Sequence, residues 1–104
     1  MKTITVQELK ALKDQNADFQ LIDVREEHEY EAANLGGILI PLATVLQNAD
    51  KIAKDKQVIV HCRSGKRSAA AILQFEKLGL TNLFNLEGGI LAYAQEIDDS
   101  LDVS

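Results

Sequence analysis

Residues 57–68 read Gln57-Val58-Ile59-Val60-His61-Cys62-Arg63-Ser64-Gly65-Lys66-Arg67-Ser68, and this stretch decides the fold. Its first five residues form an apolar run that predicts a buried strand. Residues 69–78 have the pattern of a helix, and Gly79 is placed to end it. The only cysteine therefore lies where a strand ends and a helix begins. Free backbone N–H groups of a tight turn and the positive end of a helix dipole meet at such a place.

Three cationic side chains, Arg63, Lys66 and Arg67, lie close to Cys62 in the sequence. A free cysteine titrates near pH ~8.5, and a helix N-terminus with cationic neighbours lowers this to roughly 3.5–7.5. We therefore expect a thiolate nucleophile that attacks an anionic substrate. The alternative is an inert core cysteine at a strand end. Cations at a helix N-terminus oppose the helix dipole, however, and anion binding gives a reason for their placement.

Length and composition restrict the class of protein. A chain of 104 residues predicts a single domain over residues 1–104. With 16 acidic and 11 basic residues and a net charge of −5, it is not expected to bind nucleic acid or an anionic membrane. One cysteine fits a reducing, cytoplasmic location, and two histidines with one cysteine are too few for a structural zinc site. No segment has the ~20 apolar residues of a membrane-spanning helix.

Helix and strand patterns alternate along the chain. The capping box Thr5-Val6-Gln7-Glu8 begins a predicted helix that reaches about Lys13. Further helices are expected at 26–33, 42–53 and 90–97, and further strands at 19–24, 38–41 and 82–86. The apolar positions of 42–53 expected in the core are Leu42, Val45, Leu46 and Ile52. Strands that are apolar on both faces predict an α/β fold, with a parallel sheet covered by helices on both sides. Ligands bind beyond the carboxyl ends of such strands, where Cys62 falls.

Two other stretches accompany the cysteine loop Cys62–Arg67. They are Leu21-Ile22-Asp23-Val24-Arg25-Glu26-Glu27-His28-Glu29-Tyr30 and Asn85-Leu86-Glu87-Gly88-Gly89-Ile90-Leu91-Ala92-Tyr93. In this order and spacing, the chain from about Ile4 to Ile97 resembles the rhodanese-like sulfurtransferases. Its sequence is most similar to the C-terminal rhodanese domain of enzymes that adenylate sulfur carriers for molybdopterin and thiamine synthesis. The resemblance implies a parallel sheet of about five strands and a six-residue active-site loop.

The resemblance also implies sulfur transfer in two steps, without a cofactor or a metal. Cys62 would take a sulfane sulfur from an anionic donor such as thiosulfate, and a thiol, cyanide or a sulfur-carrier protein would accept it. Asp23 and Arg25 are expected to anchor a strand end beside the site, and His28 and His61 are given no role. Gly65 is expected to shape the backbone, and the two serines to donate hydrogen bonds or cap the helix. The residues expected to bind substrate are Arg63, Ser64, Gly65, Lys66, Arg67 and Ser68.

Three other functions are open to a chain of this kind. Cysteine phosphatases present a similar loop, but they place five residues between cysteine and arginine, whereas four separate Cys62 from Arg67. The shorter loop favours sulfur over a tetrahedral phosphate. A catalytically silent binding module would usually lack the cysteine, and arsenate reduction generally needs additional thiols.

Overall fold

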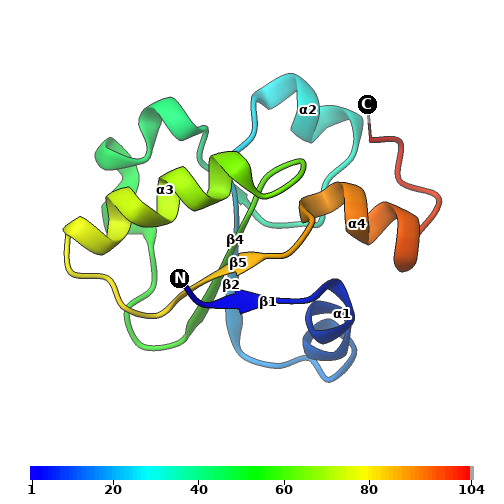
Figure 1. Ribbon diagram of the computed structural model, residues 1–104, viewed down its shortest axis with the longest axis horizontal. Coiled ribbons are helices and arrows are strands. Elements are labelled where there is room, and N and C mark those ends of the chain that lie inside the picture. The colour runs from blue at the N-terminus through cyan, green and yellow to red at the C-terminus, as the bar shows by residue number, and fades with distance from the viewer. Residues whose placement is uncertain (104) are drawn as a thin grey trace.

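The computed structural model describes residues 1–103, which form a five-stranded parallel sheet between two layers of helices (Figure 1). The strand order is β1-β5-β4-β2-β3. The central strand β4 (Gln57–His61) leads directly into Cys62, and it pairs in parallel with β2 (Phe19–Asp23) and β5 (Leu83–Leu86). The edge strands are β1 (Thr3–Ile4) and β3 (Ile38–Leu39). The predicted α/β architecture is therefore confirmed.

Each face of the sheet has its own aliphatic core. On one face, Val58 and Val60 of β4 pack with Ile72 and Phe75 of α3 (Lys66–Lys77). On the other face, Ile59 packs against the second layer, formed by α1 (Val6–Asp14) and α4 (Gly89–Glu96). Because successive side chains of a strand point to opposite faces, a strand buried on both sides must be apolar throughout. The central strand thus has both of its faces fixed by packed side chains.

The helix boundaries follow from local signals. The Thr5 hydroxyl accepts a hydrogen bond from the Glu8 N–H, and the Glu8 carboxylate accepts one from the Thr5 N–H, so the predicted capping box at the start of α1 is confirmed. Helix α3 begins at Lys66, three residues before the predicted start, and Gly79 follows its end with a φ of +91°. At 12 residues α3 is the longest helix, and none within residues 1–103 is long and apolar enough to cross a bilayer.

The segment predicted as a helix over 42–53 is helical only in part, and its winding is 3₁₀. This segment forms two 3₁₀ helices, η1 (Leu42–Thr44) and η2 (Leu46–Lys51), and Asn48 has non-helical backbone angles. The Asn48 amide donates to the Thr44 carbonyl, which gives the backbone an alternative to the regular helical pattern. Leu46 was expected in the core, but its side chain is exposed because the changed winding turns it outward.

Two remaining elements complete the arrangement. The edge strand β1 has no counterpart among the four strands that the pattern predicts; it forms because Thr3 and Ile4 pair with Asn85 and Leu86 of β5. The short helix α2 (Glu27–Ala32) follows β2 as expected. It buries none of its residues in the core, but one of its side chains is linked to the first turn of α3, beside the cysteine loop.

Candidate functional site

Cys62 lies at the carboxyl end of the central strand, and only 1% of its surface is exposed. The chain turns back over the sulfur, so that the Gly65 N–H donates a hydrogen bond to Cys62 Sγ at 3.1 Å. This turn requires Gly65 to adopt a φ of +111°, a left-handed conformation that only glycine adopts readily. Gly65 is also the residue that precedes the first turn of α3. The predicted role of Gly65 in shaping the backbone agrees with this geometry.

Hydrogen bonds to the sulfur lower the pKa of Cys62. Burial by itself raises this pKa, but it is outweighed by the Ser68 side chain and by the backbone N–H groups of Ser68, Gly65 and Ser64. The Ser64 side chain is exposed, so this residue contributes through its backbone alone. Ser68 is buried in the first turn of α3, with its hydroxyl oxygen 3.5 Å from Sγ, and it is therefore not the helix cap. The arrangement stabilises a thiolate.

Asn85 is a site residue that the sequence did not indicate. Its carbonyl oxygen accepts a hydrogen bond from the Ser68 hydroxyl at 2.6 Å, and its amide donates to the Gly65 carbonyl at 3.1 Å. A serine hydroxyl has one proton, so Ser68 serves either the Asn85 oxygen or an ionised Cys62. Asn85 thus ties the loop and the first turn of α3 to the neighbouring strand β5. The role of Asn85 could not be predicted from the neighbouring sequence, because its contact with the loop depends on the pairing of β4 with β5.

The start of α4 supports the loop from behind. The Ile90 N–H donates to the Cys62 carbonyl at 2.9 Å, and the Leu91 N–H donates to the Arg63 carbonyl at 3.1 Å. A side chain on Gly89 would have no room, because a Cβ there would lie 2.4 Å from the Arg63 carbonyl oxygen and 2.5 Å from that of Cys62. The first N–H groups of a helix lack partners within it, so loop carbonyls satisfy them here. These bonds hold two loop carbonyls against α4, while loop N–H groups face the sulfur.

The predicted cations lie in different surroundings. Lys66 is exposed at the start of α3, and Arg63 is half-buried. Arg67, in the first turn of α3, forms a two-pronged ion pair with Glu29 of α2, at 2.7 and 2.9 Å. Arg67 was predicted as a binding residue for an anion, but within the fold its charge already faces a carboxylate.

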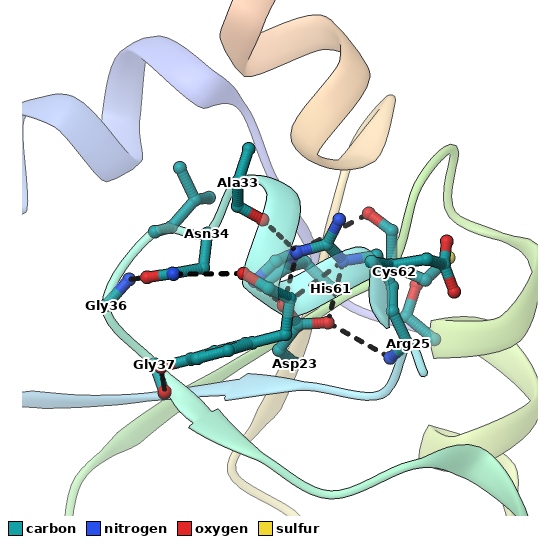
Figure 2. A network of polar contacts seen from close by, with 12 residues as sticks. Asp23, Arg25, Ala33, Asn34, Gly36, Gly37, His61 and Cys62 are labelled. Atoms are coloured by element: carbon teal, nitrogen blue, oxygen red, sulfur yellow. Dashed lines mark hydrogen bonds and ion pairs between the residues drawn. The ribbon is translucent and has the colours of Figure 1, made fainter. Parts of the chain in front are cut away.

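Asp23 and Arg25 form a buried ion pair at the end of β2, as Figure 2 shows. The Arg25 guanidinium donates to both Asp23 oxygens, at 2.8 to 3.1 Å, and to the Ala33 carbonyl at 2.7 Å. It therefore fixes the segment after α2 to the end of the strand. His61 lies between the pair and the cysteine loop, with Asp23 on one side of its ring and the Cys62 carbonyl on the other.

His61 is fully buried between Asp23 and the cysteine loop. Its Nδ1 lies 3.4 Å from the Cys62 carbonyl oxygen and its Nε2 lies 3.7 Å from Asp23 Oδ2, too far for a hydrogen bond. Burial lowers the pKa of His61, although the Asp23 charge opposes the shift, so the ring is neutral at pH 7. Its neutral ring lies at the end of β4, in register with Asp23 at the end of β2.

A cavity of about 290 Å³ lies elsewhere, lined by residues of α1, β2 and the 35–38 segment. Cys62 is not part of its lining. The features that distinguish the cysteine loop are chemical, namely a nucleophile with converging N–H donors, and do not depend on an enclosed volume.

The sheet, the loop and the sulfur environment define a rhodanese-like domain. A family model described as the rhodanese-like domain matches residues 5–96, and the chain belongs to this family. The uncharacterized protein YqhL of Bacillus subtilis is 38% identical over 98 residues, which cover 93% of this chain and 75% of YqhL.

Two further similarities extend this result. MoeZ of Mycobacterium tuberculosis, a probable adenylyltransferase/sulfurtransferase, is 29% identical over 102 residues, and the aligned region spans only 26% of MoeZ. The crystal structure of a rhodanese-like domain protein from Staphylococcus aureus has a TM-score of 0.84 at 30% identity, and the match covers 100% of this chain and 99% of that one. The predicted family and fold are confirmed, and the relatives include a protein of the sulfurtransferase type.

Proposed function

We propose that the protein is a sulfurtransferase that carries a sulfane sulfur as a persulfide on Cys62. The observation that carries this proposal is the Gly65 N–H at 3.1 Å from Sγ, in a loop that lowers the pKa of a buried thiol. A buried thiol without such donors would have a raised pKa and little reactivity. The family relationship and the printed name of MoeZ support the same chemistry.

The reaction has two steps. The Cys62 thiolate attacks the outer sulfur of a donor such as thiosulfate; a new S–S bond forms, the donor S–S bond breaks, and sulfite leaves with the electron pair. An acceptor nucleophile, such as a thiol, cyanide or a sulfur-carrier protein, then takes the outer sulfur and regenerates the thiolate. Division into two steps is the usual advantage of covalent catalysis. Loop N–H groups would stabilise the persulfide anion, as fixed donors do in oxyanion sites.

The remaining loop residues have supporting roles in this proposal. Arg63 and Lys66, and Arg67 to the extent that Glu29 leaves its charge uncompensated, would attract the anionic donor. The backbone of Ser64 and Gly65 and the hydroxyl of Ser68 would hold the sulfur. Asp23 and Arg25 are structural. The chain would act as a single domain over residues 1–104, in a reducing compartment such as the cytoplasm, because the mechanism requires a free thiol.

Mass spectrometry after treatment with thiosulfate, or with an alkyl persulfide, tests the proposal. The wild-type protein should gain about 32 Da, the mass of one sulfur atom, as expected for a persulfide. Cys62→Ser should gain nothing, because an uncharged serine hydroxyl does not replace a thiolate as nucleophile. An unmodified wild-type protein whose thiol alkylates normally would instead indicate a binding module.

A phosphatase assay distinguishes the remaining alternative. Wild-type protein should show negligible hydrolysis of aryl phosphates, because the six-residue loop brings its N–H groups close around the sulfur itself. Insertion of one glycine after Gly65 should reduce sulfur transfer by ~100-fold or more, as expected when reacting groups move by about 1 Å. Strong phosphatase activity that is lost in Cys62→Ser would contradict the sulfurtransferase proposal.

A further inference from the structure

The ion pair between Arg67 and Glu29 places a fixed negative charge beside the cysteine loop. Both Glu29 oxygens accept hydrogen bonds from Arg67, at 2.7 and 2.9 Å. This two-pronged geometry is the most specific that an arginine and a carboxylate can form. Arg67, the last residue of the cysteine loop, lies in the first turn of α3, and its side chain is 34% exposed, so the pair is partly exposed.

One further contact holds Glu29 in place, and Arg67 keeps it ionised. One of its oxygens also accepts a hydrogen bond from the Glu26 N–H at 3.0 Å and thereby caps α2. The hydrogen bonds from Arg67 are the main reason why the pKa of Glu29 falls to about 2, against the opposing effect of burial. Glu29 is therefore ionised throughout the physiological pH range, and the Glu26 carboxylate adds to the negative potential at Arg67.

We propose that Glu29 determines which sulfur donors the site accepts: it offsets the charge of Arg67, so that donors with one negative charge are favoured over the thiosulfate dianion. The donor class that fits is a persulfide, R–S–S⁻, whose reacting group has a single charge. This inference rests on the proposed sulfurtransferase function. Were Arg67 unopposed, it would add to the attraction that Lys66 and Arg63 exert on a doubly charged donor.

Two donors of matched chemistry separate charge from reactivity. Thiosulfate has two negative charges and methanethiosulfonate has one, and both transfer their outer sulfur to a thiolate. In each case the donor S–S bond breaks as the bond to Cys62 forms, and sulfite or methanesulfinate leaves with the electron pair. The ratio of the two rates of persulfide formation, followed by mass spectrometry, therefore reports the effect of donor charge.

Glu29→Gln removes the negative charge and retains an oxygen that can cap α2 and accept from Arg67. We expect the rate with thiosulfate to rise relative to the rate with methanethiosulfonate by at most about 15- to 30-fold at low salt, the upper size for one unit charge acting over ~8–10 Å near a protein surface. The change should shrink as salt is added, because salt screens exposed charges. Glu31→Gln is the matched control: Glu31 is exposed on the same helix and forms no ion pair within the described chain, so the ratio should not change.

The possible outcomes are distinct. If Glu29→Gln changes both donors equally, or neither, while both still load Cys62, the role of Glu29 is wrong and the sulfurtransferase function stands. If neither these donors nor an alkyl persulfide loads the wild-type protein, the proposed function fails, and the inference fails with it. A salt-sensitive rise confined to thiosulfate, absent in Glu31→Gln, supports the inference.

Discussion

The carboxyl ends of β2 and β4 lie side by side in the sheet, with Asp23 opposite His61, and both ends are buried. At the end of β2, the charges of Asp23 and Arg25 neutralise each other, and the guanidinium also binds the Ala33 carbonyl. At the end of β4, backbone N–H groups and the Ser68 hydroxyl converge on one sulfur atom, and the groups that lower its pKa are hydrogen-bond donors. Neighbouring strand ends in one sheet can thus become a structural anchor or a reactive site, depending on whether the buried charge is already paired.

Removing the Asp23–Arg25 ion pair, the structural anchor, should have the largest effect on the stability of the protein. Asp23→Asn leaves the Arg25 charge buried without its partner, which should reduce the free energy of unfolding by about 3–5 kcal/mol. Urea unfolding measures this loss. The control is Asp18→Asn, which removes an exposed ion pair with Lys56 and should cost less than ~1 kcal/mol. Equal losses in the two variants would show that the Asp23–Arg25 pair is not an anchor.

A change at the start of α4, which supports the cysteine loop, should mainly affect the rate of sulfur transfer. In Gly89→Ala the new Cβ would collide with the Arg63 and Cys62 carbonyls, and the loop must move. We expect sulfur transfer to fall by ~100-fold, because displacements of about 1 Å have effects of that size. Gly79→Ala is a matched control, since Gly79 also has a positive φ but a Cβ there meets nothing within 4 Å. Its strain should lower stability without changing the rate well below the unfolding transition.

The hydrogen bond from Ser68 should have a smaller effect. Ser68→Ala removes the hydroxyl that favours the thiolate, so the pKa of Cys62 should rise. One neutral hydrogen bond contributes about 0.5–1.5 kcal/mol, so alkylation by iodoacetamide at pH 7 should slow several-fold. Ser64→Ala keeps the backbone N–H and loses only an exposed hydroxyl, so its pH profile should match that of the wild type. Identical profiles for all three proteins would remove Ser68 from the site.

The Glu29–Arg67 pair links α2 to α3 and should have the smallest effect on stability. The pKa of Glu29 is lowered from 4.5 to about 2, so its contribution is complete above about pH 4.5 and is lost as pH falls through 2. Because the pair is partly exposed, we expect Glu29→Gln to reduce the free energy of unfolding by only about 1 kcal/mol at pH 7. The difference from wild type should disappear towards pH 2. A difference that is constant with pH would exclude an electrostatic origin.

Local sequence determined most of the elements and the position of Cys62, the proposed nucleophile. The apolar run before Cys62, the Thr5–Glu8 capping box and Gly79 were sufficient because each acts through residues within a few positions of one another. The spacing from Cys62 to Arg67 likewise fixed the length of the loop. These signals placed Cys62, the proposed nucleophile, between a strand and a helix, and the structure has it there.

Tertiary structure decided how that group is held. Asn85 and Gly89 reach the loop because β5 and α4 lie beside it, and Glu29 reaches Arg67 because α2 lies beside α3. Strand β1 exists only because β5 offers it an edge. Local pattern gives no information about which distant groups meet. The sequence therefore determined where the thiol lies, and long-range packing decided its hydrogen-bond donors and the charges around it.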